Sequence, residues 1–266
     1  MGIGFFGVAA AKTLQQLNPT KSLVVFDSGS TVGGVWSKDR LYPGLKTNNM
    51  LGTFEYPDFP MEPETFGIQP GEHISGEAMN EYLTRYAEKY GIINKIRRKT
   101  QVLSAEHQTG DEGGWILSIQ NGYTESRVFS RKLVIATGLT SEPFLPRIRG
   151  EEKFGAPLFH SKDFPKHSDT IQSSKSVVVF GGTKSAFDVV YAYASQGVKV
   201  DWVIRGKIGA NRSLFKYTCL TTTCVEESGH GPIWISPPYV TPLRVWLEKL
   251  VRKYDHETLT SLCFSF

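Results

Sequence analysis

The chain has little cysteine, no long apolar run and only a small excess of charge. Its three cysteines lack CxxC spacing and are odd in number, which argues against a zinc site and against a disulfide framework. No apolar run approaches the roughly 18 residues that span a bilayer. The net charge of +4 is too small and too scattered to favour nucleic-acid binding. We therefore expect a cytoplasmic protein without a transmembrane segment, whose oligomeric state the composition leaves open.

A first glycine-rich motif, G-x-G-x-x-G, begins at the second residue and leads into a predicted helix over residues 8–17. Its first glycine permits a tight turn, its second lets a pyrophosphate approach the backbone, and its third allows close packing of helix and strand. The helix N-terminus would present free N–H groups to the phosphates. Taken alone the motif is a weak signal, and a turn that binds nothing is the alternative. The residues assigned to the cofactor are Gly2, Gly4, Phe5, Phe6 and Gly7.

The residues after this turn strengthen the interpretation. A predicted strand over residues 22–26 is closed by Asp27. This aspartate lies about 20 residues after Gly7, the offset at which a carboxylate binds a ribose 2′-OH. A strand should also precede the motif, yet only Met1 does, so we expect the first unit to lack its opening strand.

A pair of adjacent glycines follows, Gly33 and Gly34, directly before Val35 and Trp36. Adjacent glycines before an aromatic residue indicate backbone that passes close to a flat ligand. A plain glycine-rich loop with a core tryptophan is the alternative. We assign Gly34, Val35 and Trp36 to the cofactor-binding residues.

The middle of the chain predicts one helix and a small antiparallel sheet. Aromatic and aliphatic residues recur at steps of three and four over residues 77–90, which indicates a helix whose stripe packs in the core. Strands are predicted over residues 99–107, 115–119 and 127–129, with turn-rich segments between them. These three strands predict an antiparallel meander.

A further strand, residues 131–138, is predicted to be buried and to end in Ala136, Thr137 and Gly138. Ligands of open α/β sheets lie beyond the carboxyl ends of strands, and small residues there would let a cofactor lie against the backbone. Prolines at positions 143 and 146 then indicate a linker. We therefore predict domains at residues 1–147 and 148–266.

The second domain repeats the opening unit, with strands predicted over residues 176–180 and 198–204 and a helix over residues 186–195. Thr183 stands where the middle glycine belongs, which would crowd a pyrophosphate. The second strand ends at Arg205, and a guanidinium suits a 2′-phosphate, although a surface arginine is the alternative. The turn residues assigned to the cofactor are Gly181, Gly182, Thr183, Lys184 and Ser185.

Two dinucleotide units with opposite charge preference predict a flavoprotein that binds FAD on the first unit and NADPH on the second. The predicted fold is α/β, with two Rossmann-like dinucleotide-binding domains. The first is an FAD-binding domain that carries the small antiparallel meander, and the second is a partial NADPH-binding domain.

Several motifs resemble those of the flavin-containing monooxygenases. Phe154, His160 and Phe164 fit that family's Phe-x-Gly-x-x-x-His motif with its later aromatic residue, except that Ala156 replaces the glycine. Without this resemblance, His160 is more readily a structural histidine than a catalyst. The other matching segments are the flavin loop at Gly33–Trp36, the strand end at residues 136–138 and the NADPH turn at residues 181–186.

The resemblance implies an activity and a catalytic residue. NADPH would reduce FAD, O2 would add to the reduced flavin, and the hydroperoxyflavin would insert one oxygen atom into a small organic substrate, in secondary metabolism. Asn48, which precedes the Pro-Asp-Phe-Pro segment at Asp58, matches the family asparagine near the flavin ring and is the expected catalytic residue. We also assign Thr47 and Val102 to the cofactor-binding residues. The substrate and the type of oxygenation stay open.

Two alternatives belong to other functional classes. The family returns to its FAD domain after the NADPH domain, whereas this sequence stops earlier. A truncated, catalytically inactive fragment that retains at most nucleotide binding is therefore one alternative. The other is a simple nicotinamide dehydrogenase, against which two opposed dinucleotide units argue.

Overall fold

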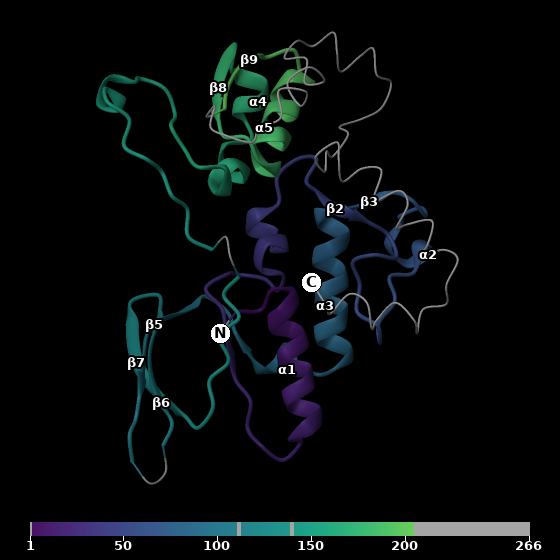
Figure 1. Ribbon diagram of the computed structural model, residues 1–266, viewed down its shortest axis with the longest axis vertical. Helices are drawn as coiled ribbons and strands as arrows, with labels where there is room; N and C mark the ends of the chain where they lie inside the picture. Colours follow the sequence, from purple (N-terminus) through teal and green to yellow (C-terminus); the bar gives the residue numbers. More distant parts are fainter. Residues whose placement is uncertain (1, 111–112, 139–140, 205–266) are drawn as a thin grey trace. The chain divides into compact units, whose positions relative to one another are not determined.

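A computed structural model describes residues 2–110, 113–138 and 141–204 (Figure 1). The chain divides into two compact units, of which the first ends at Thr170 and the second begins at Ile171. The domain boundary predicted after residue 147 therefore differs from this division and stays a prediction. Arg205 and the three cysteines lie outside the described residues.

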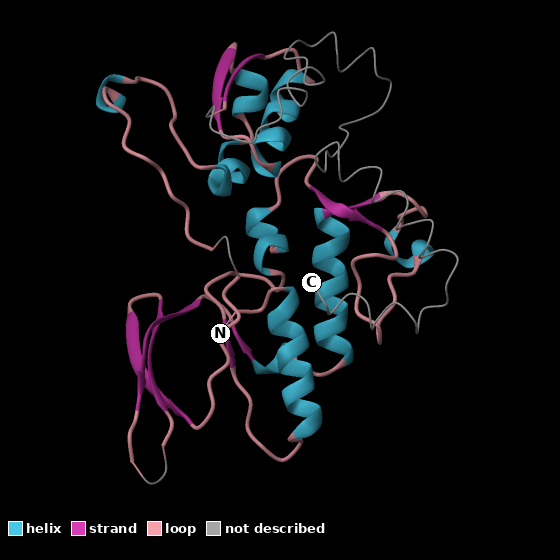
Figure 2. Cartoon of the chain, viewed as in Figure 1, coloured by secondary structure: helices cyan, strands magenta, loops and turns pink. Residues whose placement is uncertain are grey.

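Helices and strands alternate irregularly along the first unit (Figure 2). Its helices are α1 (Phe5–Leu17), α2 (Pro63–Phe66) and α3 (Gly76–Lys89), and its strands are β1 (Val25–Phe26), β2 (Lys46–Met50), β3 (His73–Ser75), β4 (Ile96–Arg97), β5 (Thr100–His107), β6 (Trp115–Asn121) and β7 (Thr124–Ser130). Short 3-10 helices are η1 (Gly34–Trp36), η2 (Lys38–Arg40), η3 (Ile93–Lys95), η4 (Glu151–Lys153) and η5 (Ser161–His167). Helix α4 (Thr170–Ser173) begins at the division between the units.

The core of the first unit lies between α1 and α3. Ser75 caps α3, because its hydroxyl accepts a hydrogen bond from the N–H of Ala78 at 3.1 Å. Met79, Tyr82 and Leu83 are fully buried on the face of α3 that its aromatic stripe predicted. The predicted helix over residues 77–90 and its role in core packing are confirmed.

The predicted antiparallel meander is also confirmed. Strand β6 pairs with β5 on one side and with β7 on the other, both antiparallel. Gly122 has φ +58 in the turn between β6 and β7, a backbone conformation that glycine adopts at low cost.

The predicted strand over residues 22–26 is shorter than expected, since only Val25–Phe26 pair, in parallel with β4.

The predicted strand at residues 131–138 is wrong. These residues form no regular secondary structure, and Val134 and Ile135 are 41% and 63% exposed. A strand needs a neighbour to satisfy its backbone groups, and no strand in the described part of the chain pairs with this segment. An apolar sequence alone therefore did not make it a buried strand.

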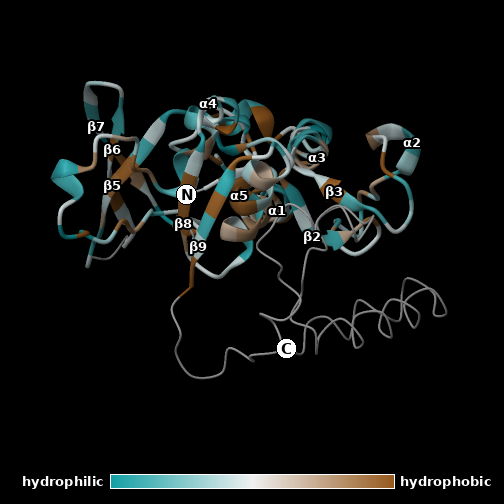
Figure 3. Cartoon of the chain, turned by 90° about the horizontal axis from the view of Figure 1, so that it is seen from above, coloured by the Kyte–Doolittle hydropathy of each residue, from teal (hydrophilic) through white to brown (hydrophobic). Residues whose placement is uncertain are grey.

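The described part of the second unit is a β-α-β unit. Parallel strands β8 (Ser176–Phe180) and β9 (Lys199–Val203) are joined by α5 (Lys184–Ala194), as predicted. Val178, Phe180 and Val203 are exposed, and in Figure 3 β8 is mostly apolar whereas polar and apolar residues alternate along β9. Within the described residues, no helix is long and apolar enough to cross a membrane, and no group of three or more His, Cys, Asp and Glu residues could hold a metal ion.

Candidate functional site

The turn that opens the chain is fixed to the end of β1 by its own backbone. The N–H of Gly2 donates to the carbonyl of Phe26 at 2.9 Å, and the N–H of Ile3 donates to Asp27 Oδ2 at 2.8 Å. Helix α1 starts immediately afterwards, with Gly4 as its N-cap and without a side-chain cap. The first-turn N–H groups of a helix have no intrahelical acceptor. The turn therefore presents a row of backbone donors at the positive end of the α1 dipole.

The three glycines of this turn differ in how closely the surrounding backbone packs against them. A Cβ at Gly7 would lie 2.0 Å from the carbonyl oxygen of Gly2, and a Cβ at Gly2 would lie 2.2 Å from the carbonyl oxygen of Ala136. At Gly4, by contrast, a Cβ would make only an ordinary contact, 3.6 Å from the Cα of Gly34. The packing of the protein therefore requires glycine at positions 2 and 7, while position 4 keeps room beside the backbone for an approaching group.

The adjacent-glycine loop lies against this turn. The N–H of Gly33 donates to the carbonyl of Ile3 at 3.1 Å, and a Cβ at Gly34 would come within 2.9 Å of the Cα of Gly4. Gly33 has φ +132, which side chains strongly disfavour. The buried Asn80 of α3 holds the loop, since its Nδ2 donates to the carbonyl of Val32 at 2.7 Å. The structure thus brings Gly33 and Gly34 against the turn, while the assignment of Val35 and Trp36 to the cofactor stays a prediction.

Asp27 has a structural task in addition to its predicted one. Its Oδ2 accepts the N–H of Ile3, and its Oδ1 accepts the N–H of Gly29 at 2.7 Å. Each carboxylate oxygen can accept a second hydrogen bond, so these contacts leave acceptor capacity for a ribose hydroxyl. The Ala-Thr-Gly segment also reaches the turn, because Ala136 packs against both Gly2 and Gly7.

Other predicted residues of the first unit lie on its strands. Thr47 is buried, and its hydroxyl accepts the N–H of Ile74 at 3.1 Å and donates to the carbonyl of Asn49 at 2.5 Å. Asn48 is exposed beside it on β2, and Val102 is half-buried on β5. None of these three takes part in the described hydrogen bonds of the turn. Their assignment to the cofactor stays a prediction.

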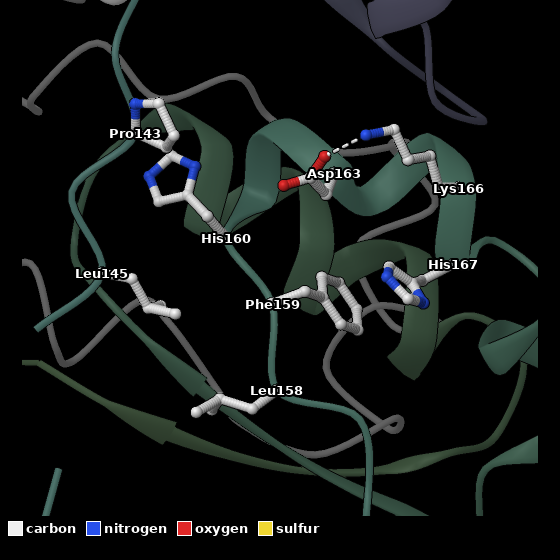
Figure 4. A pocket seen from close by; sticks show the side chains of 8 residues that line it. All are labelled: Pro143, Leu145, Leu158, Phe159, His160, Asp163, Lys166 and His167. Carbon is white, nitrogen blue, oxygen red and sulfur yellow. Dashed lines mark hydrogen bonds and ion pairs between the residues drawn. The ribbon is translucent and has the colours of Figure 1, made fainter. Parts of the chain in front are cut away.

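His160 caps a short helix. Its Nδ1 accepts the N–H of Lys162 at 3.1 Å at the start of η5. It lines a pocket of about 430 Å³ within the first unit (Figure 4). There, Lys166 pairs with Asp163 at 2.6 Å, and the ring of His167 stacks on Phe159 at 4.3 Å. The contact that the structure gives His160 is thus the cap of η5, and its role beyond that contact stays a prediction.

The second turn follows β8 in the second unit. Gly181 has φ +134, and its N–H donates to the carbonyl of Val203 at 3.0 Å. The indole of Trp202 donates to the carbonyl of Gly181 at 2.6 Å. Thr183 is the N-cap of α5, without a side-chain cap. Burial lowers the pKa of Lys184, although its pairing with Asp188 opposes the shift.

Two residues that hold the first turn were missed from the sequence. Asn80 fixes the adjacent-glycine loop, and the hydroxyl of Tyr56 donates to the carbonyl of Phe5. Asn80 carried a usable signal, because it is a polar residue inside the apolar stripe of α3. Tyr56 carried none, because its contact joins residues 51 positions apart.

Asp58 anchors α1 and carries a pH-dependent contribution to stability. Its Oδ2 pairs with Lys12 at 2.5 Å and accepts the hydroxyl of Tyr90 at 3.0 Å. Burial raises the pKa of Asp58, but the hydrogen bonds from Lys12 and Tyr90 outweigh burial and hold the pKa below its usual value. A depressed pKa stabilises the fold above the unfolded-state value of about 3.9, and this contribution is lost as the pH falls through the folded-state pKa.

Asp58→Asn is expected to lower the free energy of unfolding at neutral pH by up to about 1 kcal/mol, since the pair is partly exposed. The difference from the unchanged chain should be constant above about pH 5 and shrink below about pH 4. Urea unfolding across this pH range measures it. In a Lys12→Gln background the same substitution should cost less, and a difference that stays constant down to pH 2 would contradict the assignment.

Comparison with known proteins agrees with this geometry. The family described as pyridine nucleotide-disulphide oxidoreductase matches residues 1–226. An FAD-dependent monooxygenase of Pyrenophora dematioidea is 43% identical over 213 residues, which cover 77% of this chain and 38% of that protein. The FAD-dependent monooxygenase rstn6 of Aspergillus nomiae is 39% identical over 218 residues, covering 79% of this chain and 37% of that protein. The chain thus spans less than two fifths of the length of these curated relatives.

A solved structure shares the fold. The crystal structure of OTEMO in complex with FAD and NADP is 25% identical, with a TM-score of 0.62 over 77% of this chain and 38% of that one. The mixed α/β fold matches the FAD-binding part of such flavin monooxygenases. These findings confirm the resemblance drawn from the motifs. The chain belongs to the pyridine nucleotide-disulphide oxidoreductase family, and its relatives there are FAD-dependent monooxygenases.

Proposed function

We propose that this chain supplies the FAD-binding domain and part of the NADPH-binding domain of a monooxygenase that inserts one oxygen atom from O2 into a small organic substrate. The observation that carries the proposal is the turn at α1. Its middle glycine, Gly4, leaves space that the protein's own packing does not need, directly beside a row of backbone donors. A pyrophosphate is the group that such a turn accommodates.

The residues of the first unit fit an FAD molecule. The first-turn N–H groups of Phe5, Phe6 and Gly7 would bind its phosphates, and Asp27 would accept a ribose hydroxyl. The adjacent-glycine loop and Ala136 would bring backbone close to the cofactor, because both already touch the turn. When bound, the flavin supplies the redox chemistry with O2. The chain's own part is to bind it, orient it and exclude water.

The second unit would bind NADPH by the same means. The N-terminus of α5 follows Gly181 and Gly182 and points its backbone donors at the turn. Thr183 leaves less room there than the glycine in the first turn. We expect Lys184 and Arg205 to favour a ligand that carries an additional phosphate.

Binding of FAD tests the proposal directly. The purified chain, titrated with FAD, should bind it saturably with a yellow colour that stays with the protein through gel filtration. Addition of NADPH without oxygen should then bleach the visible absorbance of the oxidised flavin. A chain that binds no FAD in the titration would overturn the proposal.

A second candidate is nucleotide binding without turnover. Exposure of Val134 and Ile135, beside the residues that touch the turn, favours it, because apolar side chains next to a cofactor site are normally covered. It predicts saturable FAD binding without NADPH oxidation. The cytoplasmic location and the role in secondary metabolism stay predictions from the sequence.

A further inference from the structure

The loop Tyr56–Phe59 holds α1 at two points. The hydroxyl of Tyr56 donates to the carbonyl of Phe5 in the first turn of the helix, and Asp58 pairs with Lys12 further along it. Phe5 and Lys12 are seven positions apart and therefore lie on one face of α1. The loop thus fixes the direction of α1 as well as the position of its first turn.

Helix α3 fixes this loop from the other side, and α1 and α3 lie side by side (Figure 1). The hydroxyl of Tyr82 accepts the N–H of Tyr56 at 2.6 Å and donates to the carbonyl of Phe59 at 2.6 Å. The ring of Tyr86 packs on the ring of Tyr56, with 4.1 Å between their centroids. Tyr56 is buried, and these contacts fix its ring so that its hydroxyl points at the carbonyl of Phe5.

Tyr56 reaches the donor row through a single peptide group. The carbonyl of Phe5 and the N–H of Phe6 belong to the same peptide, and that N–H lies in the first turn, where no intrahelical acceptor exists. A hydrogen bond to the carbonyl polarises the peptide and strengthens its N–H as a donor. The ring of Phe5 stacks on Tyr56 at 4.3 Å, which holds the residue in place.

The Tyr56 hydroxyl stays protonated, as this task requires. Burial raises its pKa well above the usual value, and the neighbouring Tyr86, Tyr82 and Asp58 raise it further. It therefore donates its proton to the Phe5 carbonyl throughout the physiological pH range.

We propose that Tyr56 is a positioning residue for the dinucleotide phosphates. It acts through the Phe5–Phe6 peptide, whose carbonyl accepts its hydroxyl, while its ring stacks on the ring of Phe5. The inference rests on the proposed function, because it takes the α1 turn as the phosphate site. Tyr56 would act without touching the ligand. Its hydroxyl, rather than its ring, would set the hydrogen-bond strength of the Phe6 N–H.

Tyr56→Phe tests this inference, with Tyr86→Phe as the matched control. Both variants keep the aromatic ring and remove one hydroxyl from the same buried cluster, but only Tyr56 bonds to the turn. We expect Tyr56→Phe to weaken binding of both FAD and ADP about fivefold to tenfold, the upper part of the range for one lost hydrogen bond. Tyr86→Phe should leave both dissociation constants within about twofold. Calorimetric titration of the full chain measures them.

The amide of Phe6 supplies a readout that general destabilisation would not move. In NMR spectra of the unliganded chain, its proton should shift to higher field in Tyr56→Phe and stay in place in Tyr86→Phe. In the unchanged chain, addition of ADP should move the same proton to lower field. This last measurement keeps the inference open to refutation even if Tyr56→Phe fails to fold.

The outcomes separate the two proposals. If the unchanged chain binds neither FAD nor ADP, the proposed function and this inference both fall. If it binds them and Tyr56→Phe binds equally well, only the positioning role falls. An unmoved Phe6 amide on ADP binding would overturn both the positioning role and the placement of the phosphates at the α1 turn, while the FAD titration would still decide whether the chain binds FAD.

Discussion

Gly4→Ala is expected to weaken FAD binding about 100-fold while leaving the fold intact. A methyl group at this position would occupy the space beside the donor row where the pyrophosphate is proposed to lie. Forcing a methyl group into a packed contact costs about 1–3 kcal/mol, and the upper part of this range corresponds to the expected loss of affinity. Titration of the purified variant with FAD, followed by flavin fluorescence, measures the change.

The fold should tolerate this substitution for reasons that the structure gives. Gly4 has φ −75, which alanine adopts readily, and the nearest atom to the added carbon would be 3.6 Å away. Alanine is a slightly poorer N-cap than glycine, so the unfolding free energy should fall by less than about 1 kcal/mol. Gly155→Ala is the control, because a Cβ there meets nothing within 4 Å. Unchanged FAD affinity in Gly4→Ala would place the phosphates elsewhere.

Gly7→Ala is expected to destabilise the first unit by about 3 kcal/mol or more. Replacing glycine by alanine inside a helix usually stabilises it by up to about 1 kcal/mol, so helix propensity alone predicts the opposite sign. The steric clash outweighs helix propensity here and makes the change in unfolding free energy unfavourable, because the new carbon would lie 2.0 Å from the carbonyl oxygen of Gly2. That atom is backbone and is held by the bond from Gly2 N–H to Phe26, so it has little freedom to move.

Thermal and urea unfolding of Gly7→Ala beside Gly4→Ala measures this difference. The two substitutions add the same methyl group three residues apart, and only one of them should lower the unfolding midpoint strongly. Equal midpoints for the two variants would show that the turn relaxes around the added carbon. A loss of FAD binding is expected in both, but in Gly7→Ala it should accompany loss of structure.

Local patterns identified most of the elements correctly. The apolar stripe over residues 77–90 predicted α3, and alternating residues with turn-rich segments predicted the antiparallel meander. The second glycine turn predicted β8, α5 and β9. These elements depend on residues close together in sequence, whose periodicity alone determines which face is buried. The segment 131–138 failed because a buried strand depends on a neighbouring strand, which apolar composition does not supply.

The sequence by itself determined the two glycine turns, the helices that follow them and the resemblance to flavin-containing monooxygenases. Only the tertiary structure decided which glycines the packing requires and that Asp27 also binds the N–H of Ile3. It also decided that Asn80 and Tyr56 hold the site. The physical reason is separation along the chain. The contact between Tyr56 and Phe5 joins residues 51 positions apart, and no local pattern records which distant side chain reaches a given carbonyl.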